Sequence, residues 1–246
     1  MTDRRVDVRH TYDRIATHFA STREYAWPEV EAFVDRIEDG AVGLDLGCGN
    51  CRHAELLTTR TDRVIGLDIS RGLLETGRAR GADREFAGSL DLVQGDCAQL
   101  PLGRETVDLA VYVATLHHLP TREARIASLD ELARVLTDRG RALVSVWSTA
   151  HSRFEAYDED GDPVTNTDSD DGGEADGFDT TVEWTLPGGE LVDRFYHIYT
   201  PAEFEADLEA SGLETQRFEL SSGNCYADVT ADENRNALKR TSKRGE

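Results

Sequence analysis

The spacing of apolar residues along the chain predicts helices that alternate with short strands. Near the start, apolar residues recur every three or four positions, which predicts an amphipathic helix over residues 6–20. A second helix is expected to begin at Trp27-Pro28 and to stop at Gly40, and a later one to run from Thr121 to Gly140. The predicted strands cover residues 41–46, 64–67, 92–93, 107–113 and 142–147. This alternation indicates an α/β domain with a Rossmann-like, doubly wound sheet that is mostly parallel.

The pattern changes after residue 150. Residues 151–189 are acidic and glycine-rich with few apolar side chains, so we predict a flexible insertion. A calcium loop is the sharper alternative, but in the frame that begins at Asp158 the required glycine is replaced by Pro163.

Regular structure is expected to resume at Glu190. Thr200-Pro201-Ala202-Glu203 predicts a capped helix, and residues 213–220 and 224–229 predict a hairpin that adds an antiparallel strand at the C-terminal end. The sequence therefore predicts a single domain over residues 1–246. Its parts are N-terminal helices (1–39), a sheet core (40–150), the insertion (151–189) and a C-terminal helix, hairpin and tail (190–246).

Composition narrows the class of protein. No stretch approaches the roughly 20 apolar residues of a membrane span, and the first residues lack an apolar signal region, so we expect a soluble, cytoplasmic protein. Four cysteines in 246 residues do not form a disulfide framework.

The charge is unusual, because 48 Asp and Glu against 27 Lys and Arg give a formal net charge of −21. The composition resembles that of proteins from salt-loving archaea. An acidic surface argues against a nucleic-acid partner, although strong salt screening weakens that argument.

The stretch LDLGCGNCRH, residues 44–53, carries the first candidate chemistry. Asp45, Gly47 and Gly49 follow a strand and precede a helix, as in a loop that brings the backbone close to a cofactor. Asp68 ends the next strand, where a carboxylate can bind ribose hydroxyls, and Asp96 follows the third, where an acid can accept from an adenine amino group. These acids could instead be ordinary surface residues of an acidic protein. Their positions at strand ends favour a cofactor site.

The same stretch contains Cys48 and Cys51 in a C-x-x-C pattern, which has three interpretations. A redox dithiol also favours a helix N-terminus, but it does not call for the acids at later strand ends. A zinc site would need further ligands such as Cys97 and His53. We favour the third interpretation, in which cysteine is a small side chain tolerated where a cofactor packs.

Taken together, these motifs resemble class I S-adenosylmethionine-dependent methyltransferases. Residues 45–49 resemble the first motif of that family, Gly66 to Ser70 the second, and Gly95-Asp96-Cys97 the third. Residues 113–119, VATLHHL, resemble the segment that borders the reacting methyl. The resemblance implies S-adenosyl-L-methionine as cofactor and no metal. It assigns cofactor binding to Asp45, Gly47, Cys48, Gly49, Asp68, Ile69, Asp96, Cys97 and Val113.

The flanking segments resemble the tRNA wobble-uridine methyltransferases, which convert a 5-carboxymethyluridine to its methyl ester. The residues concerned are YDRIATHF and the TREYAWP after it, residues 194–199, and Gly223-Asn224 before Tyr226. Two features depart from the family: Cys51 replaces the third glycine of the first motif, and the acidic insertion matches nothing recognisable. Cysteine is small and unbranched, which suits the start of a helix.

The resemblance implies the following roles. A carboxylate acceptor needs no general base but does need a cation, for which Arg23 is the candidate; it could instead hold the carboxylate of the cofactor. His117 or His118 is expected to contact the acceptor, and Tyr196, His197 and Asn224 are substrate-side candidates. The implied partners are the tRNA anticodon loop and a small zinc-binding activator protein that covers a hydrophobic sheet edge.

Three other functions stay open at this point. The first is a methyltransferase for a small molecule of the quinone or sterol type, which would share the core and the LHHL segment. The second is a dithiol oxidoreductase using Cys48 and Cys51. The third is a catalytically silent scaffold that keeps the fold but binds no cofactor.

Overall fold

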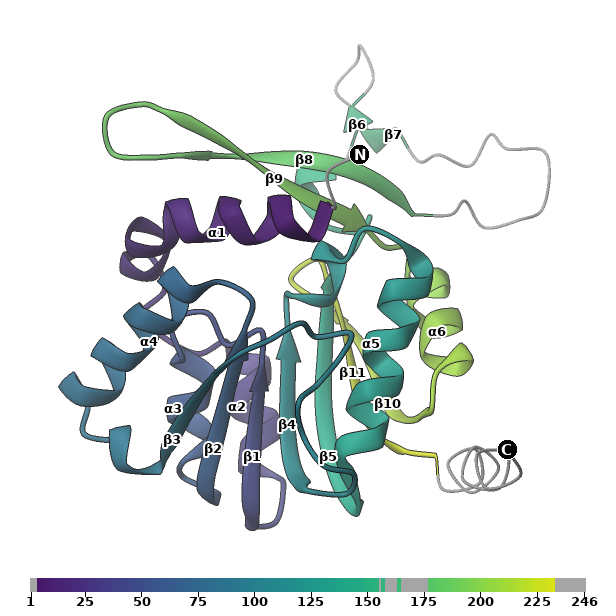
Figure 1. Cartoon of the computed structure of the whole chain (residues 1–246). Helices are drawn as coiled ribbons and strands as arrows, with labels where there is room; N and C mark the ends of the chain where they lie inside the picture. Colours follow the sequence, from purple (N-terminus) through teal and green to yellow (C-terminus); the bar gives the residue numbers. More distant parts are fainter. Residues whose placement is uncertain (1–3, 155, 158–162, 165–176, 233–246) are drawn as a thin grey trace, which may run out of the picture.

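The computed structural model describes residues 4–154, 156–157, 163–164 and 177–232 (Figure 1). Its centre is a seven-stranded sheet in the order β10-β11-β5-β4-β1-β2-β3. The strands β1 to β5 are parallel to one another, and β11 pairs antiparallel with β5 and with β10. The strands are β1 (Gly40–Leu46), β2 (Thr61–Asp68), β3 (Leu90–Gln94), β4 (Val107–Val113), β5 (Leu136–Trp147), β10 (Leu213–Ser221) and β11 (Asn224–Ala231). The predicted Rossmann-like sheet with an antiparallel C-terminal hairpin is confirmed.

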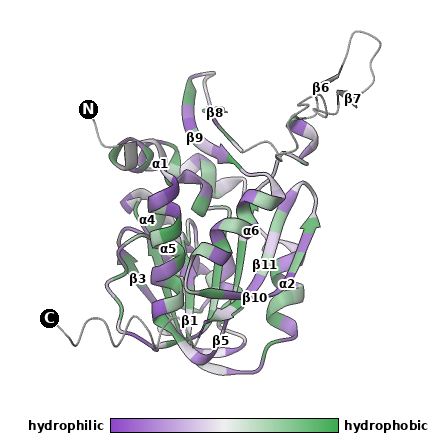
Figure 2. Cartoon of the chain, turned by 90° about the vertical axis from the view of Figure 1, so that its right-hand side faces the viewer, coloured by the Kyte–Doolittle hydropathy of each residue, from purple (hydrophilic) through white to green (hydrophobic). Residues whose placement is uncertain are grey.

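Helices cover both faces of this sheet because its strands are apolar on both sides. The helices are α1 (Arg4–Ser21), α2 (Pro28–Asp35), α3 (Arg52–Leu57), α4 (Arg71–Asp83), α5 (Arg122–Val135) and α6 (Pro201–Ala210). One buried cluster joins α5 and α6 to the sheet through residues such as Leu129, Val144 and Phe204, and a second joins α2 and α3 through residues such as Phe33 and Val111. Figure 2 shows hydrophobic positions along the sheet, whereas α5 and α6 mix hydrophobic and hydrophilic positions.

The carboxyl ends of the parallel strands are roofed by α1 and by a two-stranded ribbon of β8 (Phe178–Thr185) and β9 (Leu191–Ile198) (Figure 1). Tyr12 and Ile15 of α1 pack with Val192 of the ribbon and with Leu73 of α4. Short strands β6 (Ala156–Tyr157) and β7 (Pro163–Val164) form a separate antiparallel pair. No helix among the described residues is long and apolar enough to span a membrane.

Two predicted boundaries are wrong. The helix begun at Thr121 ends at Val135, and residues 136–140 belong to β5, because Leu136 pairs with Val107 in the parallel ladder. The flexible insertion predicted over residues 151–189 contains β8, which pairs along its whole length with β9. Its polar face contacts solvent, so the strand carries only a weak apolar signal. The residues 165–176 of that prediction and the tail from 233 onward lie outside the described residues.

The helix cap and the hairpin turn of the C-terminal segment form at the residues predicted for them. The Thr200 hydroxyl accepts a hydrogen bond from the Glu203 backbone N–H at 3.1 Å, which confirms the helix cap. Ser222 and Gly223 both have positive φ, at 51° and 75°, as a two-residue hairpin turn of this handedness requires. The hairpin thereby places β11 against β5 in register, with Asn224 opposite Trp147.

The loop after β1 is packed tightly around the third position of the predicted motif. Cys51 has φ 62°, a left-handed conformation that glycine adopts without strain, and its side chain is fully buried. A Cβ placed on Gly77 of α4 would lie 2.5 Å from the Cys51 Sγ. The missing side chain at Gly77 therefore leaves the space that the Cys51 thiol fills.

This packing predicts compensation between the two positions. Gly77→Ala should destabilise the protein by about 1–3 kcal/mol through overpacking. Adding Cys51→Gly should recover most of that loss, because the thiol is removed and glycine suits the positive φ. Chemical denaturation of the two single variants and the double variant measures the coupling. Additive effects would contradict the proposed contact.

Candidate active site

A pocket opens at the carboxyl ends of the parallel strands, beneath α1 and the β8–β9 ribbon. Twelve of the fifteen residues predicted for the site line it. They are Arg23, Gly47, Cys48, Gly49, Asp68, Ile69, Asp96, Cys97, Val113, His117, His118 and Tyr196. Asp45, His197 and Asn224 are not among the lining residues. The topology explains the convergence, since the carboxyl ends of adjacent parallel strands meet at one edge of the sheet.

Asp68 is fixed at the end of β2 by the cofactor-type loop. One of its carboxylate oxygens accepts from the Gly49 backbone N–H and the other from the Ser70 backbone N–H, each at 2.9 Å. Each oxygen keeps a lone pair for a hydroxyl, so the residue fits a ribose diol. Burial raises the pKa of Asp68 to about 6. Asp96, after β3, also faces the pocket, and its carboxylate accepts from the Ala98 backbone N–H at 2.9 Å.

Asp45 lies below the pocket. It is only 1% exposed, and its carboxylate accepts a hydrogen bond from the Ala54 backbone N–H at 2.8 Å. Burial raises its pKa to about 7. This hydrogen bond connects β1 to the first turn of α3 and so stabilises the loop between them.

The four cysteines are free and buried. A hydrogen bond with Cys51, together with burial, holds the pKa of the Cys48 thiol well above its usual range, and burial does the same for Cys97. A redox dithiol would need the opposite shift, because the thiolate is the nucleophile. Within the described part of the chain, no three His, Cys, Asp or Glu side chains come together as a metal site.

The hydrogen bonds of the two histidines define their tautomers. His118 must donate from Nδ1 to the Phe195 carbonyl, at 2.8 Å, so its Nε2 accepts from the Tyr12 hydroxyl, also at 2.8 Å. His117 accepts from the Trp147 backbone N–H through Nδ1 at 3.2 Å, so its proton lies on Nε2. That N–H is buried in the pocket wall and has no partner. Burial lowers the pKa of both, that of His118 to about 4, so both rings are neutral.

Arg23 brings a partly buried cation to the pocket. Its guanidinium lies 3.9 Å from the centre of the Phe19 ring and 5.0 Å from that of Trp184. Its hydrogen bond runs to the neighbouring Thr22 hydroxyl at 2.6 Å, and no carboxylate among the described residues pairs with it. Burial lowers its pKa, which measures the cost of holding this charge without a counterion.

The β8–β9 ribbon extends this aromatic and cationic wall. Arg194 donates to the Tyr196 hydroxyl at 2.7 Å, and its guanidinium lies 4.9 Å from the Trp184 ring centre. Tyr196 stacks on His117 with ring centres 4.9 Å apart and on Trp147 at 4.8 Å. The resulting wall is flat, apolar and flanked by two arginines, which fits a planar anionic group.

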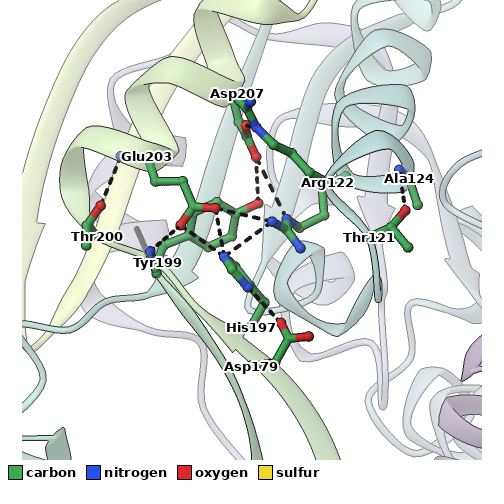
Figure 3. Close-up of polar contacts among 11 residues, drawn as sticks. Thr121, Arg122, Ala124, Asp179, His197, Tyr199, Thr200, Glu203 and Asp207 are labelled. Carbon is green, nitrogen blue, oxygen red and sulfur yellow. Dashed lines mark hydrogen bonds and ion pairs between the residues drawn. The ribbon is translucent and has the colours of Figure 1, made fainter. Parts of the chain in front are cut away.

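His197 points away from the pocket into a buried ion cluster (Figure 3). Its ring lies between Asp179 and Glu203, at 2.9 Å from each carboxylate, and Arg125 bridges to Glu203 at 3.2 Å. Alternation along β9 explains the difference, since Tyr196 and His197 must face opposite sides. The cluster anchors the ribbon to α5 and α6, so the contacts of His197 are structural.

Asn224 also lies outside the pocket lining. Its amide donates to the Ser222 carbonyl at 3.2 Å within the hairpin turn, while its Oδ1 is buried without a partner. Its place opposite Trp147 puts it one strand away from the aromatic wall. Its assignment to the substrate stays a prediction.

Sequence reasoning missed several residues that line the pocket. These are chiefly Tyr12, Phe19, Trp27, Asn50, Arg52, His53, Thr115 and Trp147. Arg52 and His53 directly follow the glycine loop, so their position in the motif was a usable signal. Trp184 and Arg194 are not among the lining residues, but they contact Arg23 and Tyr196, which are. Trp184 had no sequence signal, because the β8–β9 pairing and the packing of the ribbon on α1 are long-range.

Comparisons with known proteins agree with this geometry. Residues 44–144 match the family model described as a methyltransferase domain. A tRNA (carboxymethyluridine(34)-5-O)-methyltransferase from Schizosaccharomyces pombe is 31% identical over 225 residues, covering 83% of this chain and 87% of that protein. One of the same name from Arabidopsis thaliana is 37% identical over 57% of this chain, and the match spans only 32% of its own length.

Solved structures share the fold. The CcbJ methyltransferase from Streptomyces caelestis superposes with a TM-score of 0.65 at 20% identity, covering 90% of this chain and 97% of that one. A complex between the Haloferax volcanii Trm112 methyltransferase activator and a methyltransferase gives a TM-score of 0.62 at 17% identity, with 91% and 97% covered. The pocket, the acids at the strand ends and these matches lead to one conclusion: the chain belongs to the family of S-adenosylmethionine-dependent methyltransferases that includes the S. pombe enzyme.

Proposed function

We propose that the protein transfers the methyl group of S-adenosylmethionine to the carboxylate of a 5-carboxymethyl-type wobble uridine in tRNA, forming a methyl ester. The observation that carries this proposal is the unpaired guanidinium of Arg23, held in an aromatic wall beside the cofactor loop. A partly buried cation without a counterion loses some of its hydration in the empty site, and an anionic acceptor would offset that cost. The names of the relatives supply the matching substrate class.

Neither His117 nor His118 offers a free base, which favours a carboxylate acceptor over a phenol. His118 uses both ring nitrogens, and His117 presents an N–H where a base would need a lone pair. A quinol or sterol-type hydroxyl must lose a proton to attack, whereas a carboxylate is already ionised at neutral pH. The site therefore fits the acid better than the small-molecule alternative.

In this reaction the pocket residues chiefly have to align the acceptor carboxylate with the methyl group; they do not have to deprotonate it. The bound cofactor supplies an electrophilic methyl group. Arg23 can hold one oxygen of the acceptor carboxylate while the other attacks in line. The Nε2–H of His117 can donate to the acceptor, and Tyr196 offers a flat surface for the uracil ring.

A small activator protein is proposed as partner, in line with the Trm112 complex among the structural neighbours. Of the two edges of the main sheet, β3 is the more apolar. Leu90, Leu92 and Val93 along it are partly exposed. The groove beside it is lined by Leu74 and Leu92 together with the polar and charged residues Arg71, Glu75, Arg78 and Gln94. Such a partner would also add RNA-binding surface to a chain of net charge −21.

Arg23→Gln should lower kcat/KM for tRNA by about 100-fold, because a charge-assisted hydrogen bond to the acceptor is lost. Arg23→Lys should recover part of it, since the charge returns without the planar fork. The assay is label transfer to tRNA from a strain lacking the protein, in molar salt. Arg217→Gln, which removes an exposed arginine of β10 paired with Glu219, is the matched control and should change nothing. Equal activity in Arg23→Gln and wild type would reject this role.

Affinity for S-adenosylhomocysteine should fall as the pH drops through about 6, because protonated Asp68 accepts ribose hydroxyls less well. In the protein without ligand, protonation of Asp68 has the opposite effect, because it stabilises the folded state. The folded state keeps a proton that the unfolded state releases, so the free energy of unfolding falls as pH rises from about 4 to about 6. Titration calorimetry from pH 5 to 8 measures the first effect. Asp68→Asn should weaken the binding of S-adenosylhomocysteine and remove its pH dependence near pH 6, while Asp45→Asn should keep that pH dependence.

Leu92→Arg should prevent co-purification with a Trm112-type activator, because it puts a charge on the proposed contact edge. Leu220→Arg is the control, since Leu220 is 50% exposed on β10, the opposite edge strand. Unchanged binding of S-adenosylhomocysteine would verify that both variants are folded. If the activator still co-purified with Leu92→Arg, the proposed interface at β3 would be wrong.

A further inference from the structure

The pocket contains two arginines that pack on different aromatic side chains, which define two adjoining corners. Arg23 belongs with Phe19, Trp184, Arg194 and Tyr196, as described above. Arg52 belongs with Trp27, where its guanidinium lies 5.2 Å from the ring centre. Neither guanidinium forms an ion pair with a carboxylate of the described residues. Burial lowers the pKa of both, that of Arg52 to about 10, where the charge of Arg23 adds to the effect and that of Asp45 opposes it.

His53 adds a second unsatisfied group to the Arg52 corner. Its ring lies 6.3 Å from the Trp27 ring. The residue lines the pocket and is only 6% exposed, and its buried Nε2 has no hydrogen-bond partner. Burial and the nearby Arg52 and Arg80 hold its pKa well below the usual range, so the ring is neutral. A buried polar atom without a partner is costly, which indicates that a ligand completes it.

The cofactor brings one carboxylate and the proposed acceptor brings another. At the cofactor sulfur the methyl group and the amino-acid chain diverge, so the acceptor and the cofactor carboxylate must occupy different parts of the pocket. The acceptor corner is the one with His117 and Tyr196, because its groups are flat, apolar and without a base. The other corner lies beside the glycine loop, because Arg52 and His53 follow Gly49 closely in the chain. It remains for the amino-acid end of the cofactor.

We propose that Arg52 and His53 bind the carboxylate of S-adenosylmethionine, which leaves Arg23 for the acceptor. The guanidinium forms a charge-assisted hydrogen bond with one carboxylate oxygen, and His53 donates from Nε2 to the carboxylate. Trp27 holds both side chains in place by ring contacts. The assignment of Arg23 rests on the proposed function, whereas that of Arg52 and His53 rests only on the cofactor.

Calorimetric titration of the full chain with two ligands tests this assignment. One ligand is S-adenosylhomocysteine, and the other is S-adenosyl-3-thiopropylamine, the same molecule without its carboxylate. Arg52→Gln and His53→Leu should each weaken S-adenosylhomocysteine binding by about 10- to 100-fold. Both should bind the decarboxylated ligand as wild type does. Arg52→Lys and His53→Gln, which keep a donor, should recover part of the loss.

Arg23→Gln is the decisive comparison, because its affinity for S-adenosylhomocysteine should stay within about twofold of wild type. A large carboxylate-dependent loss in Arg23→Gln, with none in Arg52→Gln or His53→Leu, would overturn the assignment. Equal losses of both ligands in Arg52→Gln and His53→Leu would indicate a structural role and would also overturn it. These outcomes are independent of tRNA activity, so a failure of the proposed acceptor leaves the binding result intact.

Discussion

Positive charge that lacks an ion-pair partner inside one pocket is the constraint on which the site depends. Burial lowers the pKa values of Arg23 and Arg52. Neither forms an ion pair with a carboxylate in the described structure, and the buried Asp45 only partly offsets the charge of Arg52. The fold meets this cost with aromatic faces, Phe19 and Trp184 on one side and Trp27 on the other. Such faces hold a guanidinium in position without neutralising it, so both charges stay available for anionic ligands.

The acidic exterior and the cationic pocket are compatible because they act over different distances. A net charge of −21 repels anions at long range in dilute salt, but at molar salt the screening length is only about 3 Å. Buried charges are screened far less, so Arg23 and Arg52 keep their effect under both conditions. Under the proposed function, RNA affinity would then come from contacts inside the pocket and from a partner surface, and very little from the exterior of this chain.

The sheet and the loop at its carboxyl edge were predictable because local signals specify them. Apolar runs predicted the strands, and Asp68 and Asp96 were found from their positions at strand ends. The ribbon was not predictable, since the pairing of β8 with β9 and its packing on α1 are non-local. The sequence also did not show which residues of β9 face the pocket. Tyr196 and His197 were therefore both assigned to the substrate, although their side chains face opposite sides of the strand. For Asp45 the motif was found, but the structure places the carboxylate against the Ala54 backbone.

The central claim is that the transferred methyl group forms an ester. The most direct measurement uses labelled S-adenosylmethionine and tRNA from a deletion strain, followed by mild alkali treatment of the purified tRNA. The account predicts that nearly all label in tRNA is released as methanol, because a methyl ester hydrolyses under these conditions. Label that stays on the tRNA after alkali, as on a base nitrogen or a ribose oxygen, would contradict it.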